Sequence, residues 1–517
     1  MKRAFTGGRV LTMAPGPEPE VVVIESGRIV AVGERAMLTT HPDALEVDLG
    51  GRMLVPGFID AHNHLSIAAL HPRWHDVSTV TSMEELLDAA RAQAAADPDT
   101  PWVRVCGWNE VTTGVAPTRI ELDSLGLDRP VIVAHFSLHQ AVVCSRGLDE
   151  LGVGHGTPDP VGGEIARSAD GEPTGLLIER AWSHAHARSL EGYTDPDRWG
   201  EWVVDRAKSL LRHGITAIHD AACPPDAEEL FHRLAEDGRL PISVLVMPHS
   251  NAVLTHELGA RIEGPRTGHG DEDVRVGAVK FFADGGVAIA LDVSVHGQPV
   301  QFGITMDDLE SCLLGAVQHG YRVGVHAIGN VGVQRAIEAF AAARRLGTDG
   351  DHRFRIEHVG LASKEQCRAL ADLGAVAVVQ PGFVDHVGEQ SGGVRFDEHA
   401  WLPFATLAEA GVPLAASSDD PCAPVAPLWC SARGATRTTT AGRVFEAEQA
   451  VDFDAWLHAY TAGSAYAGGQ EHERGSIAPG LRADFVVLDG RLDPHDPPHV
   501  AETWVAGEQV FVANGDG

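Results

Sequence analysis

Short apolar runs alternate with helical patterns through the middle of the chain. Eight of these runs have the length and composition of buried strands, and most are followed by a periodic helical segment. They lie at residues 54–62, 215–220, 242–247, 274–284, 322–327, 354–359, 376–380 and 413–419. Strands that alternate with helices are typical of a parallel sheet. Eight such units predict an α/β (β/α)8 TIM barrel, whose reactive groups lie at the carboxyl ends of the strands.

The two ends of the chain have the pattern of short strands alone. Runs at 9–12, 21–24 and 28–33 resemble runs at 483–488, 502–507 and 509–512. Neither end has enough strands to be stable by itself, which favours one β-sandwich built from both termini over two unrelated sheets. The predicted domains are therefore residues 1–56 and 466–517 for the sandwich and residues 57–465 for the barrel.

A long insertion separates the first two barrel strands. Residues 65–195 contain strand-like runs at 102–106, 131–135 and 141–144 and a helical pattern at 83–95, which predicts an inserted α+β segment. Asp195 and Pro196 then fit the N-cap and first position of a helix. The chain has 517 residues, and its excess over the ~250 of a plain barrel is assigned to this insertion and the two ends.

Composition restricts the class of protein further. The net charge of −32 disfavours nucleic acids and anionic membranes as partners, because both require basic patches. No apolar run is long enough to span a membrane. The seven cysteines are sparse and lack CxxC spacing, as expected in a reducing cytoplasm. These features predict a cytoplasmic protein that acts on a small molecule.

Residues that bind metals stand at the ends of five predicted barrel strands. His62 and His64 alternate along the end of the first run, so their imidazoles point to the same side. Neutral imidazole is the commonest metal ligand. The other candidates are Lys280, His326, His358 and Asp419. Their joint placement in one layer of the barrel predicts a divalent metal site.

Each of these residues alone has a simpler explanation. A single His326 or His358 is typical of a hydrogen-bonded core histidine. Lys280 alone would extend to the rim of the barrel, and Asp419, which precedes an Asp-Pro pair, would form a turn. The combination of all of them at strand ends favours the metal site.

Several motifs resemble the amidohydrolase superfamily, specifically its YtcJ-like (Amidohydro_3) branch. They extend along nearly the whole chain and occur in the expected order. The motifs are PGFIDAHNH at 56–64, GWN at 107–109, GGE at 162–164, DGEPTGL at 170–176, VK at 279–280, DG at 284–285, HAIG at 326–329, EH at 357–358, SDDP at 418–421, YT at 460–461 and GSIAPGLRAD at 475–484.

The resemblance implies a distorted barrel with a sandwich from both termini. It also implies one or two divalent ions, usually Zn²⁺, held by His62, His64, His326 and His358, with Asp419 as the last ligand. Lys280 matches a position that many members carbamylate, which would convert a costly buried ammonium into a carboxylate that bridges two metals. A mononuclear site with another role for Lys280 stays open. A homodimer is expected from the superfamily, without an identified interface.

The expected reaction is hydrolysis of a non-peptide C–N bond in an amide, N-acyl, formamide or cyclic amide. A bound metal lowers the pKa of water from about 15.7 towards about 7 and so generates hydroxide at neutral pH. Asp419 is expected to accept the proton as general base and to donate it to the leaving nitrogen as general acid. The alternatives are cleavage of an ester, lactone or C–C bond or deamination at the same site, and a non-catalytic ligand-binding descendant.

Substrate contacts are expected in the loops at the barrel end and in the insertion. The candidates are Trp108, His139, Phe282, Gln380 and His386. Trp108 is equally compatible with core packing, and Arg437 with either a substrate carboxylate or a surface ion pair. His219 and Asp220 are interpreted as rim residues.

Overall fold

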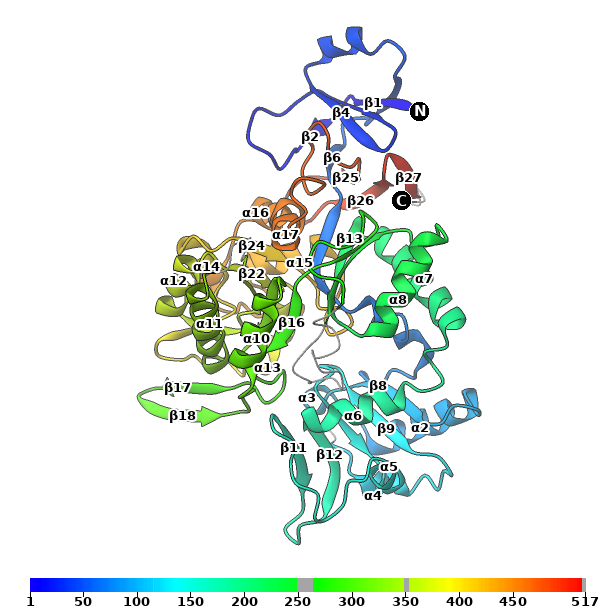
Figure 1. The fold of residues 1–517 in the computed structure, drawn as a ribbon, viewed down its shortest axis with the longest axis vertical. Helices are drawn as coiled ribbons and strands as arrows, with labels where there is room; N and C mark the ends of the chain where they lie inside the picture. The colour runs from blue at the N-terminus through cyan, green and yellow to red at the C-terminus, as the bar shows by residue number, and fades with distance from the viewer. Residues whose placement is uncertain (115, 249–263, 348–352, 514–517) are drawn as a thin grey trace.

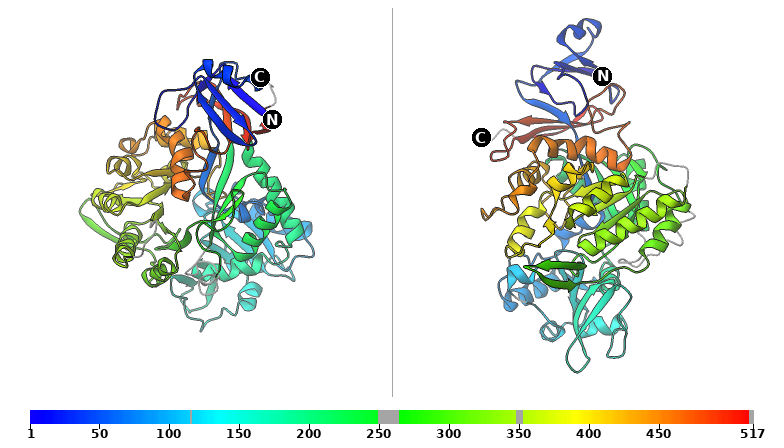
Figure 2. Two further views of the ribbon diagram at one scale, coloured as in Figure 1. Left: turned by 45° about the horizontal axis from the view of Figure 1, so that its top comes forward. Right: turned by 90° about the vertical axis from the view of Figure 1, so that its left-hand side faces the viewer.

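The protein has three parts stacked along its longest axis (Figure 1). The computed structural model describes residues 1–114, 116–248, 264–347 and 353–513. Sheets from the two termini lie at one end, a barrel-like α/β unit lies in the middle, and the inserted segment lies at the opposite end (Figures 1 and 2). The middle unit is therefore in contact with both other parts.

Each of the eight runs predicted for the barrel contains a strand. Side-by-side strands of the middle unit are parallel, as predicted. They are β7 (Phe58–Asn63), β13 (Ile215–Cys223), β14 (Ser243–Pro248), β15 (Val274–Val276), β16 (Val279–Phe282), β19 (Val323–Ala327), β20 (Arg355–His358), β22 (Val376–Val379) and β24 (Leu414–Ala416). Nearly all of their residues are buried, because helices and the inserted segment cover the strands.

The middle unit is TIM-barrel-like, but its described strands form two sheets rather than one continuous ladder. One sheet has the order β15-β14-β13-β7 and the other β16-β19-β20-β22-β24. The first interruption follows Val276, between β15 and β16. A Cβ on Gly277 at this point would come within 2.8 Å of Leu245. The second lies between β24 and β7.

Two backbone hydrogen bonds join the sheets at this second interruption. The amide of Asp419 donates to the carbonyl of His62 at 2.8 Å, and the amide of His64 donates to the carbonyl of Asp420 at 3.0 Å. Three of the four residues in these bonds, His62, His64 and Asp419, are predicted metal ligands. The bonds thus bridge one of the two interruptions at the candidate site.

Helices follow most of the strands, and their ends match local sequence signals. Asp195 caps α7 by accepting a hydrogen bond from the amide of Arg198, and Pro196 is the first helical residue, as predicted. The helices that flank the middle unit are α7 (Pro196–Leu211), α8 (Pro225–Glu236), α10 (Leu309–Gln318), α11 (Asn330–Arg345), α12 (Lys364–Asp372), α13 (Phe383–Gln390), α14 (Phe404–Glu409), α15 (Pro427–Thr436), α16 (Phe453–His458) and α17 (Ser464–Gly468).

The terminal strands form two sheets, of which one combines both ends of the chain. The first is β4 (Arg28–Gly33), β3 (Val21–Glu25), β1 (Lys2–Thr6) and β5 (Leu45–Asp48). The second is β2 (Arg9–Val10), β6 (Met53–Pro56), β25 (Phe485–Asp489), β26 (His499–Val505) and β27 (Glu508–Val512). Between the sheets, the ring of Phe5 meets those of Phe485 at 5.4 Å and Trp504 at 5.1 Å. These aromatic contacts hold the two ends together.

The run predicted as the first barrel strand is divided at Gly57. Its first half is β6 in the terminal sheet and its second half is β7 in the middle unit. A Cβ at Gly57 would overlap the side chain of Thr216, so only glycine lets the chain cross between the two parts here.

The inserted segment has its own sheet and core. Its strand order is β11 (Gly163–Arg167), β12 (Pro173–Glu179), β10 (Gln140–Val143), β9 (Val131–His135) and β8 (Val103–Trp108). Helices α2 (Met83–Ala96), α4 (Arg119–Asp123), α5 (Ser145–Glu150) and α6 (Arg180–Ser189) accompany it. A separate hydrophobic cluster, which includes Leu86, Val105 and Val133, packs within it.

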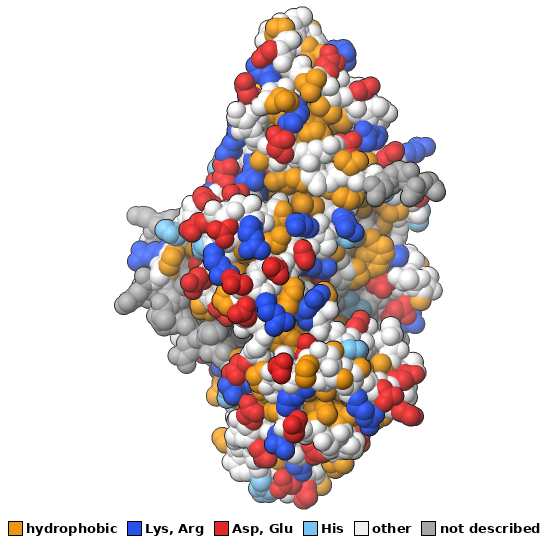
Figure 3. Space-filling view, turned by 90° about the vertical axis from the view of Figure 1, so that its right-hand side faces the viewer, with side chains coloured by type: hydrophobic (Ala, Val, Ile, Leu, Met, Phe, Trp, Pro, Cys, Tyr) orange, Lys and Arg blue, Asp and Glu red, His pale blue; other side chains and the backbone are white. Residues whose placement is uncertain are grey.

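Acidic and basic side chains are intermixed over the face in Figure 3. Among the described helices, none is both long enough and apolar enough to cross a membrane.

We expect a substitution at Gly214, just before β13, to destabilise the junction of the middle unit with the terminal sheets. Gly214 has φ of +77°, and an added Cβ would lie 2.8 Å from Val486 and 3.0 Å from Phe58. Gly238 has φ of +63° with no atom within 4 Å of an added Cβ, so Gly238→Ala is the matched control. The control should lose about 1 kcal/mol from backbone strain, and Gly214→Ala a further ~1–3 kcal/mol from the clash. Denaturant unfolding measures the difference, and equal losses would contradict the packing argument.

Candidate metal centre

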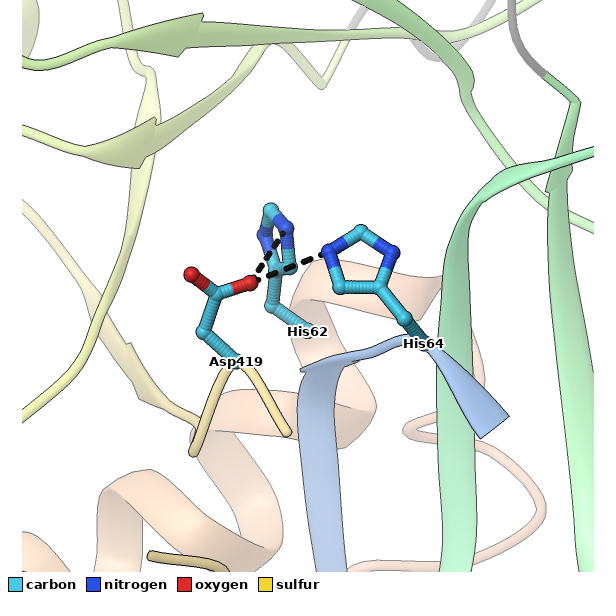
Figure 4. Close-up of side chains that lie close together, drawn as sticks. All are labelled: His62, His64 and Asp419. Carbon is cyan, nitrogen blue, oxygen red and sulfur yellow. Dashed lines mark hydrogen bonds and ion pairs between the residues drawn. The ribbon is translucent and has the colours of Figure 1, made fainter. Parts of the chain in front are cut away.

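Two histidines and an aspartate converge at the seam between β7 and β24 (Figure 4). Oδ1 of Asp419 lies 3.0 Å from Nε2 of His64 and 3.4 Å from Nε2 of His62. One ligand atom from each of the three residues lies within 4.8 Å of the others. Nearby groups at this separation can share one ion, since metal–ligand bonds of histidine and carboxylate are about 2.0–2.2 Å long.

Three histidines of the cluster each have Nδ1 within hydrogen-bond distance of an acceptor oxygen of the protein. The pairs are His62 with Glu357 Oε2 at 2.7 Å, His64 with the carbonyl of Ala221 at 2.7 Å, and His358 with Gln380 Oε1 at 2.9 Å. A carboxylate, a carbonyl and an amide oxygen only accept, so each Nδ1 carries the proton. Each Nε2 therefore carries a lone pair rather than a proton, which is the tautomer a metal ligand needs.

The remaining candidate ligands surround His62. Ring centroids of His358 lie 4.8 Å from His62 and 4.6 Å from His326. Nζ of Lys280 lies 3.1 Å from Nε2 of His62. The structure thus brings together all six residues selected from the sequence as metal ligands.

Burial and neighbouring charges set the protonation of this cluster. Burial, and then the adjacent Lys280, hold the pKa of His62 well below its usual 6.5. Burial also lowers the pKa of Lys280 to about 8. Burial opposes ionisation of Asp419, but the facing rings of His62 and His64 outweigh it and lower the pKa of its carboxyl below the ordinary 3.8. Burial therefore keeps His62 neutral, while the Asp419 carboxyl stays ionised.

Two residues of the cluster have unusual backbone conformations. The φ angles of His358 and Asp419 are +74° and +63°, in the left-handed region that side chains other than glycine rarely occupy. Such strain costs about 1–3 kcal/mol and persists where the surrounding structure enforces it. His358 is the last residue of β20 and Asp419 lies three residues after β24, and the side chains of both line the shared cavity.

A buried ion pair beneath the cluster was not assigned a role from the sequence. Arg355 Nε donates to Glu357 Oε1 at 2.5 Å, and the other oxygen of Glu357 accepts from His62. Arg355 also bonds to Nδ1 of His219 at 2.8 Å and to the carbonyl of Ala61. The Glu-His dipeptide at the end of a strand was the available signal, because alternation places Glu357 on the face opposite its neighbour His358.

A cavity of about 530 Å³ opens onto the cluster and is lined by all six candidate ligands. His139, Phe282 and His386, which are predicted substrate contacts, also line it. His139 lies on the inserted segment, and its Nδ1 is 2.6 Å from the buried carboxylate of Glu179. Much of the remaining wall is apolar and includes Leu70, Leu138 and Leu190.

Other predicted contacts do not line the cavity. Trp108 packs in the core of the inserted segment, and Gln380 lies behind His358 and orients its ring. Arg437 is fully buried and donates to backbone carbonyls of Trp401, Leu402 and Phe445, so it is available to no substrate. The position of Gln380 could not be distinguished from a lining position by strand periodicity alone.

The interpretation of His219 and Asp220 as rim residues is wrong. Both are fully buried inside the middle unit. His219 bonds to Arg355, while Asp220 accepts hydrogen bonds from the backbone amide and hydroxyl of Ser66. They support the strand ends from within because β13 extends three residues beyond the predicted run, to Cys223.

Solved structures share this overall architecture. An uncharacterized metal-dependent hydrolase from Pyrococcus horikoshii OT3 superposes with a TM-score of 0.73 over 96% of this chain and 98% of its own, at 23% sequence identity. One from Pyrococcus furiosus gives 0.71 over 96% and 100%, at 24% identity. The fold is thus one used by metal-dependent hydrolases.

Residues 45–511 match the amidohydrolase family (the Amidohydro_3 type), and the chain belongs to that family. An N-substituted formamide deformylase from Arthrobacter pascens is 32% identical over 498 residues, which cover 92% of this chain and 91% of the relative. The putative amidohydrolase YtcJ of Bacillus subtilis is 30% identical and covers 99% of both chains. The resemblance seen in the sequence motifs is confirmed.

We expect Glu357→Gln to weaken metal binding about 10–100-fold, because the amide no longer holds the Nδ1 proton of His62 as a carboxylate does. Chelator competition monitored by elemental analysis measures this affinity. The control is Glu365→Gln, since Glu365 is exposed and pairs only with Arg368 among the described residues. Unchanged metal affinity in Glu357→Gln would contradict the orienting role.

Proposed function

We propose that the protein is a metal-dependent hydrolase of a non-peptide C–N bond in a small molecule. The observation that carries this proposal is the set of imidazoles whose Nδ1 atoms are each held by a protein acceptor, with Nε2 atoms of His62 and His64 facing the Asp419 carboxylate. Imidazole nitrogens and a carboxylate oxygen that face one another form the type of ligand set that binds a divalent ion. These residues therefore fit a divalent ion, with zinc favoured by the histidine-rich ligand set.

The residues that would hold one or two ions are His62, His64, Lys280, His326, His358 and Asp419. A bound ion supplies a Lewis acid for the substrate carbonyl and makes a water molecule more acidic. Asp419 is placed to accept a proton from the attacking water, because its carboxylate lies at the wall of the cavity beside His62 and His64. The same carboxyl then donates the proton to the departing nitrogen.

The substrate bond is inferred from family membership and from the relatives. One relative is named as an N-substituted formamide deformylase, which supports an amide-type C–N bond as the target here. The apolar portions of the cavity wall fit a substrate with a hydrophobic substituent. Hydrolysis of an ester or lactone at the same site is the second candidate, because the proton transfers by Asp419 would be the same.

We expect Asp419→Asn to lower turnover about 10²–10⁴-fold, since it removes the group that transfers the proton. Most of the metal should remain, because the histidines are unchanged. A panel of N-substituted formamides, acetamides, cyclic amides and esters measures turnover, and elemental analysis measures the metal. Asp372→Asn, at an exposed position of α12, is the control.

Full turnover in Asp419→Asn would overturn the proton-transfer role. A wild-type protein that holds no metal and cleaves no compound in the panel would instead favour a non-catalytic binding protein.

We expect Lys280→Met to lower the metal content, if Lys280 is carbamylated and bridges two ions. The amine would add CO2 with loss of a proton, and ¹³C-bicarbonate should give a carbamate signal in the wild type but not in the variant. Lys364→Met, on the exposed face of α12, is the matched control. Full metal content in Lys280→Met would contradict the bridge and favour a mononuclear site.

A further inference from the structure

A guanidinium is buried in the inserted segment behind the cavity wall. Arg104, on β8, is 0% exposed, and its guanidinium carbon lies 4.5 Å from the ring centre of Trp74 and 5.5 Å from that of Trp182. It donates to Ser189 Oγ at 2.5 Å and to Nδ1 of His186 at 3.4 Å. Among the described residues it forms no ion pair, and its buried Nε has no hydrogen-bond partner.

An uncompensated cation in a dry interior is costly, because removal from water is not balanced by an opposite charge. Its stacking between two indoles offsets part of this cost. Burial lowers the pKa of Arg104 only to about 10, so the group stays charged at neutral pH. The charge of Arg104 therefore creates a positive potential at His186 and at the part of the cavity that His186 lines.

Helix α6 connects this cation to the cavity. Ser183, His186, Ala187 and Leu190, spaced by three and four residues, line the cavity along the helix and just beyond its end. Trp182, His186 and Ser189 instead contact Arg104. Residues at these spacings share a helix face, so His186 lies on the border of both faces.

The contact with Arg104 fixes the tautomer of His186. A guanidinium has no acceptor, so Nδ1 of His186 must accept and the proton must reside on Nε2. Burial, and then Arg104, hold the pKa of His186 well below 6.5, which keeps the ring neutral. His186 therefore offers an N–H donor to the cavity, with Ser183 one turn away and a buried cation behind it.

We propose that His186, supported by Arg104, binds a carboxylate of the substrate at the cavity wall formed by α6. This inference deepens the proposed hydrolase function: the scissile group is held at Asp419, and a negatively charged group on the same molecule is held at His186. Apolar side chains such as Ile67 and Leu70 also line the cavity and fit a hydrocarbon linker. The substrate class is thus an N-acylated or N-formylated compound that carries a carboxylate.

The test measures binding of hydroxamates, which chelate divalent ions, to the metal-loaded protein by calorimetry. One series carries a terminal carboxylate on alkyl chains of increasing length, and the matched series ends in methyl. We expect the best carboxylate probe to bind about tenfold or more tightly than its methyl counterpart, as for a charge-assisted hydrogen bond. His186→Leu and Arg104→Met should abolish this preference while the methyl probes bind as before.

The matched control is His184→Leu, on the same helix but exposed, which should keep the preference. Thermal unfolding establishes that each variant is folded, and if Arg104→Met is not, His186→Leu decides alone. Equal affinity of carboxylate and methyl probes for the wild type overturns the inference, as does a preference that survives in His186→Leu.

Failure of the metal centre gives a different result. Both hydroxamate series would then bind no better than simple alkanoates and alkanols, which contradicts the proposed function. The carboxylate preference is then read from the alkanoates against alkanols of the same length, with the same variants and the same two outcomes.

Discussion

The buried ion pair between Arg355 and Glu357 is the interaction on which the site depends. Each charge alone would be costly inside the barrel-like unit, and each is compensated by the other and by hydrogen bonds to neighbouring strands. Arg355 reaches β7 through the carbonyl of Ala61 and β13 through His219, while Glu357 reaches His62. One pair thus fixes three strands and one imidazole relative to each other.

The geometry above this pair follows from that constraint. Glu357 fixes which nitrogen of His62 is protonated, and Gln380 and the carbonyl of Ala221 do the same for His358 and His64. The φ angles of His358 and Asp419 are costly for an isolated chain, and the packed strands on both sides impose them. The free energy of folding therefore offsets the cost of holding these imidazole nitrogens and the carboxylate close together.

Much of the candidate site could be predicted from the sequence, because strand alternation and the position of strand ends are local properties. His62, His64 and Asp419 were placed by that reasoning, and they converge as expected. The contacts of Arg355 and His186 could not be found in this way, since each depends on a partner more than eighty residues away. Trp108 and Gln380 show a different limit of this reasoning. Strand periodicity predicts the side of a strand on which a residue lies, but not whether that residue faces the cavity.

The seam between β7 and β24 places a sparsely bonded joint of the middle unit at its candidate metal centre. The described barrel strands are joined by ladders within each of the two sheets, whereas across this seam the backbone is joined by the amides of His64 and Asp419. An ion bound by side chains on both sides of that joint would stabilise the closed form, because it binds only when both sides are in place. Ion binding and local opening of the barrel are therefore linked equilibria. Hydrogen exchange at the amides of His64 and Asp419 would report on this opening.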